Sequence, residues 1–278
     1  MIILAHDGSI YGDWVARYAI HFAAQEQDHK LLLLHVVDGK VGPEIVDSRF
    51  SSLAAECDAC NVEFLPQHLL LGPSVHRTLR QAIPPDPEAL LVCGTRVKPR
   101  RQNYLAGTVS EKLLRMHQCP VVALRVVQPG LLGNPHELLL PLAGHLHGYF
   151  RVAPILLRLG PSLRSLHMCR AMRINPLRHP QLSRERELLL KEIGRKYLAK
   201  FQTEMEEALG PLPFRCEQQT VIASDWVLEI LLQASRLRSQ LMLLGLSERS
   251  LAYRVFHSTE IERIIHETPC DIGIYRGL

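Results

Sequence analysis

A basic segment between two glycines carries the residue types that bind phosphate. Gly94 and Gly107 bound the segment, and glycine lets a backbone approach a ligand closely because it has no side chain. A helix is predicted to begin at Thr108, directly after the second glycine, and the first backbone N–H groups of a helix attract anions. Four cations fall within six residues of the same segment: Arg96, Lys98, Arg100 and Arg101. The pattern therefore predicts an anion site.

Both ends of the segment supply further groups. Thr108, Val109 and Ser110 would present backbone N–H groups and two hydroxyls at the start of the helix. At the other end, Cys93 and Gly94 close a predicted strand, and ligands of open α/β sheets bind beyond the carboxyl ends of the strands. Ordinary helix capping and a solvated basic loop remain the alternative interpretation of these residues.

An aspartate follows another predicted strand. Residues 1–5 form a short apolar run typical of a buried strand, and Asp7, Gly8 and Ser9 then supply a turn and a helix cap. At this position Asp7 can accept a hydrogen bond from a ribose or a base. The combination of Asp7 with the basic segment favours a nucleotide as the ligand.

The elements that must position these residues alternate along the first half of the chain. Strands are predicted at residues 1–5, 31–37, 64–71, 89–94 and 121–126. Helices are predicted between them, at residues 14–23, 43–60, 74–83 and 108–117. Five strands alternating with four helices indicate a doubly wound α/β domain with a parallel sheet, which we assign to residues 1–128.

The second half repeats this order after a linker rich in proline and glycine at residues 128–135. Strands are predicted at residues 137–142, 165–172, 240–245 and 271–275, with helices at residues 149–159, 226–237 and 259–266. The offset between matching segments grows from 136 to 151 residues, which indicates an insertion in a second domain at residues 136–278. A long helix over residues 183–209 accounts for the insertion. It is interpreted either as a crossover packed on the sheet or as a partner-binding surface.

Composition limits the class of protein. A chain of 278 residues favours two domains, and 47% hydrophobic with 22% charged residues indicates a globular chain with a sizeable core. The net charge of +4 is too small and too dispersed for a nucleic-acid binder. No apolar stretch approaches the ~20 residues that a membrane-spanning helix needs, and no leader pattern is found, so we expect a cytoplasmic protein without membrane contact. Seven cysteines without regular spacing are expected to be reduced.

The basic segment resembles the nucleotide-binding motif of the universal stress protein family, Gly-x2-Gly-x9-Gly-[Ser/Thr]. In this chain it stands as Gly94-x2-Val97-x9-Gly107-Thr108. Three further segments resemble the same family: residues 3–9, 33–38 and 119–122. The resemblance covers the first half well and the second half more faintly. It implies two tandem five-stranded domains of the adenine nucleotide alpha hydrolase-like type.

The resemblance also implies roles for individual residues. In ATP-binding members of the family, the aspartate matching Asp7 and the backbone at Val36 hold the adenosine. Cys93 and Gly94 lie under the ribose and the phosphates. The phosphate oxygens are bound at positions matching Gly107, Thr108, Val109 and Ser110. The implied ligand is ATP or a related adenine nucleotide, and the implied output is regulatory, in a stress response, rather than catalytic.

The chain departs from the family pattern at several positions. Val97 stands in place of the second glycine, and its branched side chain resists the backbone angles that glycine adopts. In the second half Ala143 replaces the aspartate, Glu248 matches Val97, and Ser258 replaces a glycine. Because a carboxylate repels phosphate, we expect nucleotide binding in the first half, with the second half as its structural support.

Other functions stay open at this point. A nucleotide-free interaction scaffold, which engages an unidentified protein through the basic segment or the long helix, is the main alternative. Family members associate through their last strands, which predicts that residues 121–125 pair with residues 272–275 within this chain. A homodimer of such chains is compatible with that pairing.

Two short motifs point to metal or redox chemistry with less force. Cys57 and Cys60 have the spacing of a redox pair but lie within a predicted helix, where burial is the favoured interpretation. His145 and His147 have no third ligand nearby, so a solvated loop is favoured over a metal site. No catalytic residue and no metal ligand is assigned.

Overall fold

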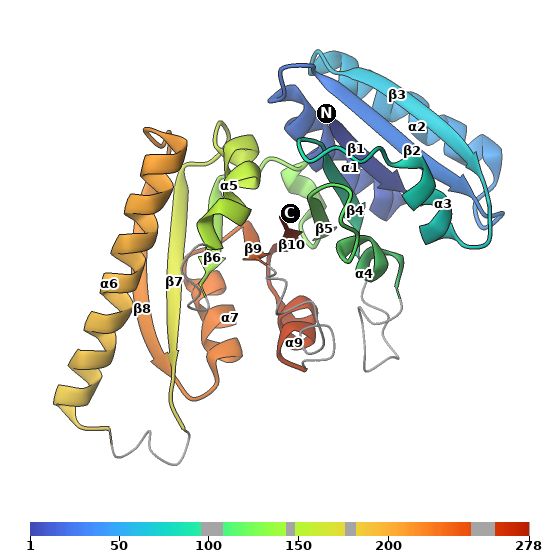
Figure 1. The fold of residues 1–278 in the computed structure, drawn as a ribbon. Coiled ribbons are helices and arrows are strands. Elements are labelled where there is room, and N and C mark those ends of the chain that lie inside the picture. Colours follow the sequence, from blue (N-terminus) through green and yellow to red (C-terminus); the bar gives the residue numbers. More distant parts are fainter. Residues whose placement is uncertain (96–107, 143–147, 176–181, 246–258, 278) are drawn as a thin grey trace.

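The computed structural model describes residues 1–95, 108–142, 148–175, 182–245 and 259–277. Within these residues ten strands form one continuous sheet (Figure 1). The first half contributes β1 (Ile2–His6), β2 (Lys30–Val37), β3 (Glu63–Leu70), β4 (Leu90–Gly94) and β5 (Val121–Arg125). The second half contributes β6 (Glu137–Pro141), β7 (Ser165–Arg173), β8 (Arg215–Ala223), β9 (Leu241–Gly245) and β10 (Asp271–Arg276). Their order across the sheet is β3-β2-β1-β4-β5-β10-β9-β6-β7-β8.

Helices cover both faces of this sheet. One face packs against α1 (Ile10–Ala24), α2 (Pro43–Ala59), α5 (Gly148–Leu159) and α6 (Arg184–Leu209). The other face packs against α3 (Val75–Ala82), α4 (Val109–Leu114), α7 (Trp226–Arg236) and α9 (Thr259–Glu267). Central strands are therefore buried on both sides, which is why they read as nearly continuous apolar runs. In the described part of the chain, none of the helices is both long enough and apolar enough to cross a bilayer.

The second half contains one strand that the sequence analysis missed. β8 follows α6 as β3 follows α2, and it pairs in parallel with β7 from Arg215 to Ala223. Its first residues are polar and largely exposed because β8 is the last strand of the sheet, so it lacks the apolar run of a central strand. Part of the additional length of the second half lies in α6, the crossover helix equivalent to α2, which has 26 residues against 17. Its N-cap is Ser183, whose hydroxyl accepts the backbone N–H of Arg186 at 3.3 Å.

The two halves meet at β5 and β10, which run antiparallel. Ile272 lies opposite Arg125, and Tyr275 lies opposite Val122. The strand pairs within each half are parallel. This register confirms the predicted contact between residues 121–125 and residues 272–275. The α/β fold of two tandem five-stranded units is also confirmed, and the units share one sheet.

A buried carboxylate fastens α1 and the linker to this junction. Asp271, the first residue of β10, is fully buried. Its Oδ1 accepts the backbone N–H groups of Val127 and Gln128, both at 2.7 Å. Its Oδ2 accepts the Tyr18 hydroxyl at 2.7 Å. Burial raises the pKa of the Asp271 carboxyl, and the three donors act against that rise.

The linker itself packs on α1. It contains a short 3-10 helix, η1 (Pro129–Leu131), and then Gly133. Gly133 has a φ of +76°, which favours glycine, and a Cβ built there would lie 2.5 Å from the Tyr18 backbone nitrogen. Residues 128–135 are therefore a packed element of the fold rather than a loose tether.

We expect Asp271→Ala to lower the free energy of unfolding by at least about 3 kcal/mol, because it leaves three buried donors without their acceptor. Tyr18→Phe removes one of these hydrogen bonds and is expected to cost about 1 kcal/mol. Urea denaturation at neutral pH measures both values. Equal losses for the two variants would contradict the assignment of Asp271 as the shared acceptor.

Candidate functional site

The first half of the sheet has a topological switch point between β1 and β4. From β1 the strand order runs to β2 and β3 on one side, while β4 and β5 lie on the other. The connections leave these two strands toward opposite faces, and ligands of open α/β sheets bind beyond the carboxyl ends of the strands at such a point. Asp7 follows β1 at this edge and Thr95 follows β4. An equivalent point in the second half lies between β6 and β9.

Asp7 is exposed at this edge, in the turn between β1 and α1. Its Oδ1 accepts the Ser9 backbone N–H at 3.1 Å and the Ser9 hydroxyl at 2.6 Å. The Ser9 hydroxyl oxygen accepts the Gly12 N–H at 3.3 Å and so caps α1. The predicted turn and helix cap are confirmed, and they hold the Asp7 carboxylate at the β1–β4 edge.

A buried histidine fixes the shape of this turn. His6 Nδ1 accepts the Gly8 N–H at 3.0 Å, which assigns the ring proton to Nε2, and Nε2 donates to Asp13 Oδ1 at 3.1 Å. Gly8 has a φ of +76°, and a Cβ built there would lie 3.1 Å from His35 Cε1. A glycine is therefore needed at the position directly after Asp7.

Asp13 extends this contact to α2. Its Oδ2 forms an ion pair with Arg49 Nη1. Burial alone would raise the pKa of the Asp13 carboxyl, but the hydrogen bonds from His6 and Arg49 and the charge of Arg49 outweigh burial and lower it. Asp13 is therefore ionised at neutral pH, and the His6–Asp13–Arg49 network ties β1, α1 and α2 together next to the turn that carries Asp7.

β2 ends beside Asp7. The register of β1 with β2 runs as far as His6 opposite His35, so Asp7 and Val36 each follow the last pair. His35 Nδ1 donates to the His6 carbonyl oxygen at 3.0 Å, and its ring contacts Phe50 edge-on. The Val36 side chain is buried in the layer of α3 and α4, so the part of Val36 left for a ligand is its backbone.

At the end of β4, Cys93 and Gly94 can offer backbone only. The Cys93 side chain is 3% exposed, and burial raises the pKa of its thiol to about 12. Gly94 is exposed, and a Cβ built there would meet Val15 Cγ2 at 3.5 Å, an ordinary contact. The described neighbours therefore do not require glycine at position 94, and a close approach by a ligand stays a prediction.

Thr108 is the N-cap of α4, as predicted. Its Oγ1 accepts the Glu111 N–H at 3.1 Å and lies 3.1 Å from the Ser110 hydroxyl. Ser110 is buried and Val109 is exposed. α4 ends at Leu114, earlier than predicted. Both hydroxyls are engaged within the chain, so the groups suited to an anion are the first-turn N–H groups of Val109 and Ser110, which have no acceptor within a helix.

Several residues singled out from the sequence lie outside the described residues. In the first half these are Arg96, Val97, Lys98, Arg100, Arg101 and Gly107. In the second half they are Ala143, His145, His147, Glu248 and Ser258. Their expected roles remain predictions.

The second switch point is built from different side chains. Arg170 has the place in β7 that His35 has in β2, and its Nη1 donates to the Leu142 carbonyl oxygen at 3.1 Å. His35 makes the equivalent bond to the His6 carbonyl oxygen. The Arg170 guanidinium lies over the Tyr197 ring, 4.5 Å from its centroid. The second half thus has an arginine and an aliphatic residue where the first half has two histidines.

The backbone frame of the two edges is nevertheless the same. A Cβ built at Gly94 would meet Val15 Cγ2 at 3.5 Å, and one built at Gly245 would meet Val152 Cγ2 at 3.5 Å. β4 and β9 therefore end at equal distances from the first helices of their halves. The repeat preserves the packing of its strands and helices while the polar groups at the edge differ.

The cysteine pair and metal binding gain no support from the geometry. Burial raises the pKa of the Cys57 thiol to about 12, which is the opposite of the lowering that activates a thiol. Cys60 is the C-cap of α2, and both thiols are free. In the described ranges, no three histidine, cysteine or acidic side chains gather closely enough to hold a metal ion.

The arrangement of the whole chain has counterparts among solved structures. A universal stress protein from Archaeoglobus fulgidus matches 98% of this chain and 95% of its own, with a TM-score of 0.60 and 14% sequence identity. A putative universal stress protein from Pseudomonas aeruginosa matches 99% of this chain and 92% of its own, with a TM-score of 0.57 and 15% identity. The chain has the fold of a tandem universal stress protein.

The universal stress protein fold also occurs in a different setting. The cytoplasmic domain of a prokaryotic cation chloride cotransporter matches 99% of this chain and 94% of its own, with a TM-score of 0.57 and 11% identity. No protein-family model and no curated protein matches the sequence. At these identities the likeness establishes the fold alone, so what the chain binds must be argued from its own residues.

Within this universal stress protein fold, sequence reasoning missed the residues that support Asp7. His6, Asp13 and Arg49 come from a strand and two different helices, and their contact depends on how α1 and α2 pack. One local signal was present, because His6 is a polar residue at the end of an apolar strand. Nothing in the local pattern indicated its partners.

Gly12 is the point where α1 comes closest to the His6 ring, because a Cβ built there would lie 2.6 Å from Nε2. We expect Gly12→Ala to displace the ring from Asp13 and to lower the free energy of unfolding by about 1–3 kcal/mol. Gly130→Ala is the control, since a Cβ there meets no atom within 4 Å, and it should change stability by less than about 0.5 kcal/mol. Urea denaturation compares the two. A harmless Gly12→Ala would show that His6 is not held by close packing.

Proposed function

We propose that this chain binds an adenine nucleotide at the β1–β4 edge of its first half and acts as a nucleotide-responsive regulator. The observation that carries the proposal is the placement of Asp7, an exposed carboxylate at the switch point of the sheet, bonded to Ser9 and set on the turn that His6 closes. An ionised carboxylate only accepts hydrogen bonds, which suits the hydroxyl pair of a ribose.

The other proposed contacts follow from the same edge. The Val36 backbone, at the end of the neighbouring strand, would meet the base, and the backbone of Cys93 and Gly94 would lie under the ribose. The first-turn N–H groups of Val109 and Ser110 would bind phosphate oxygens. By resemblance, Val97, Gly107 and Thr108 and the basic segment belong to the phosphate end. The carboxylate at one end of the site suits the ribose hydroxyls of a nucleotide. The backbone amides and cations at the other end suit its phosphates.

The bound nucleotide would serve as a signal rather than as a substrate. The residues at this edge would hold and orient the nucleotide, and none of them is proposed as a positioned general base, so any hydrolysis of ATP should be slow. A regulatory role in a stress response, in the cytoplasm where ATP is abundant, agrees with this assignment.

We assign ligand binding to residues 1–128 and structural support to residues 136–278. At the second switch point Arg170 bonds to the Leu142 carbonyl as His35 bonds to that of His6, and the residue that matches Asp7 is Ala143. Replacement of the aspartate by Ala143 removes the ribose acceptor. The second half then contributes by completing the sheet and by fastening α1 through Asp271.

Asp7→Ala tests the proposed site. Calorimetric titration of the full chain with ATP should give saturable binding, and the variant should bind about tenfold more weakly or worse, because a hydrogen bond to a charged group contributes about 1.5–3 kcal/mol. Thermal unfolding of the variant without ligand should show that it is folded.

Asp28→Ala is the matched control. Asp28 Oδ1 accepts the Lys30 backbone N–H at 3.3 Å, the same short turn that Asp7 forms with Ser9, but it precedes β2 at the opposite edge of the first-half strands. Its removal should leave the affinity for ATP unchanged. Equal losses in both variants, or no saturable binding below about 1 mM ATP, would remove the proposed site and leave an interaction scaffold of the same fold.

A further inference from the structure

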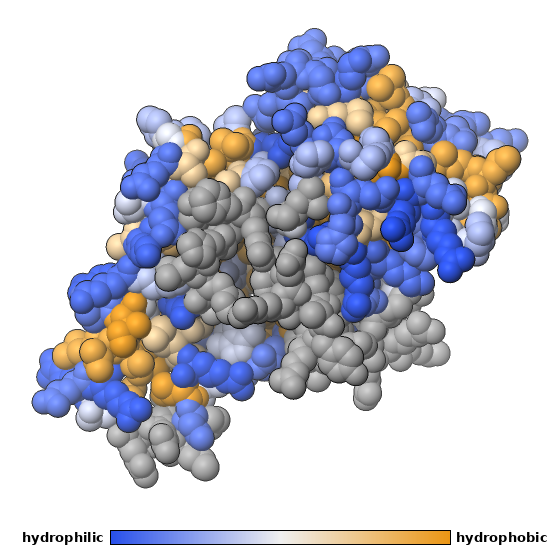
Figure 2. Space-filling model, in the orientation of Figure 1, coloured by the Kyte–Doolittle hydropathy of each residue, from blue (hydrophilic) through white to orange (hydrophobic). Residues whose placement is uncertain are grey.

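α6 carries an exposed apolar ridge that no other described element covers. The helix has 26 residues against 17 in the equivalent α2. Its inner face is buried at Gly194, Leu198, Phe201 and Met205. Near its start, Leu188 and Leu189 are 60% and 59% exposed, and we call these two residues the α6 ridge. Figure 2 shows hydrophobic side chains gathered over this end of α6.

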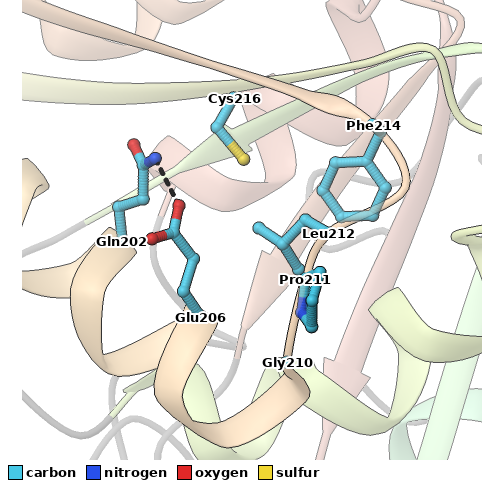
Figure 3. Close-up of a pocket in the computed structure, with 7 residues that line it drawn as sticks. All are labelled: Gln202, Glu206, Gly210, Pro211, Leu212, Phe214 and Cys216. Atoms are coloured by element: carbon cyan, nitrogen blue, oxygen red, sulfur yellow. Dashed lines mark hydrogen bonds between the residues drawn. The ribbon is translucent and has the colours of Figure 1, made fainter.

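The other end of the same helix borders an open hollow of about 470 Å³. Pro211, Leu212 and Phe214 line one side of it, and Gln202 and Glu206 line the other (Figure 3). Gln202 Nε2 donates to Glu206 Oε1 at 2.6 Å. We call this feature the α6 hollow. It lies about 25 Å along the helix from the ridge, at ~1.5 Å per residue.

The charged residues of α6 also differ between its two ends. From Arg184 to Lys200 there are six basic and three acidic residues, a net charge of +3. The rest of the helix has three acidic residues and no basic one: Glu204, Glu206 and Glu207. Glu206 and Glu207 are exposed, so the end of α6 beside the hollow is acidic while the end with the ridge is basic.

We propose that α6 is the interface of a homodimer in which the α6 helices of two copies pack antiparallel. A two-fold axis near the small, exposed Ala199 sets the ridge of each copy over the hollow of the other. The same axis sets the basic part of each helix against the acidic part of its partner. Such an interface is isologous, because one surface supplies both the projecting and the receiving feature.

A second copy is the occupant that the charges favour. An antiparallel copy of α6 places its acidic part opposite the basic part of the first helix and its ridge opposite the hollow. A parallel copy would place like charges opposite one another, and an unrelated helix would need its own matching charges and apolar side chains. The last strands of the two halves, β5 and β10, already pair with each other within one chain, so they are not open to a second copy. α6 flanks β8, one end of the ten-stranded sheet, where a second chain can approach.

Charge reversal in separate variants tests this arrangement. Analytical ultracentrifugation of the full chain at about 100 µM should show a dimer. Lys191→Glu with Lys196→Glu makes both parts of the helix acidic, and Glu206→Lys with Glu207→Lys makes both parts basic. Each double variant should be monomeric at that concentration, since like charges then face one another in its homodimer.

An equimolar mixture of the two double variants should recover the dimer, because each acidic part then meets a basic part. Glu44→Lys with Asp58→Lys is the control on α2, the equivalent helix of the first half, and it should leave the wild-type dimer intact. The experiment needs no nucleotide, so it is independent of the proposed function.

Three results would each overturn the proposal. These are a wild-type chain that sediments as a monomer at about 100 µM, double variants that remain dimeric, and monomeric double variants whose mixture stays monomeric. The last result would show that α6 carries a different contact or none. Recovery in the mixture also shows that both variants are folded.

Discussion

β5 and β10 run antiparallel, and this one reversal lets two parallel half-sheets share a single ten-stranded sheet. The last strand of each half is thereby covered on the side where it would otherwise be a sheet edge. Asp271 adds to the constraint because its carboxylate binds α1 through Tyr18 and the linker through two backbone amides. The same helix, α1, begins at the turn that carries Asp7, so the junction and the candidate site share a structural element.

The two halves show how a repeat can diverge in chemistry while it keeps its frame. A Cβ built at Gly94 would lie as far from Val15 Cγ2 as one built at Gly245 would lie from Val152 Cγ2, 3.5 Å in both halves. The polar groups at the strand ends differ, because Arg170 now bonds to the Leu142 carbonyl oxygen where His35 bonds to that of His6. Packing constrains the distances between strands and helices in both halves. A ligand would constrain the polar groups at the strand ends, and only in the half that binds it. This difference agrees with a single ligand-binding half.

The central strands and the helix caps at Ser9, Thr108 and Ser183 could be predicted from the sequence, because buried parallel strands and N-caps have local patterns. The pairing of β5 with β10 was predicted from the family resemblance, and its antiparallel register comes from the structure. β8 could not, since residues 215–220 at the start of this edge strand are mainly polar, whereas the other edge strand, β3, keeps an apolar pattern. The His6–Asp13–Arg49 network also left no local pattern, because its members meet only after α1 and α2 pack on the sheet. At the candidate site, the position of Asp7 and the turn and helix cap at Ser9 were predictable, whereas the contacts of His6 with Asp13 and of Asp13 with Arg49 were not.

Amide hydrogen exchange with and without saturating ATP can locate the bound nucleotide, because it reports on both halves of one chain at once. If the β1–β4 edge of the first half holds the nucleotide, exchange slows in residues 7–12 and in the first turn of α4, while the end of β6 and the first turn of α9 exchange as before. Slower exchange at the second-half edge, or no change at either edge, would show that the first half does not hold the nucleotide as proposed.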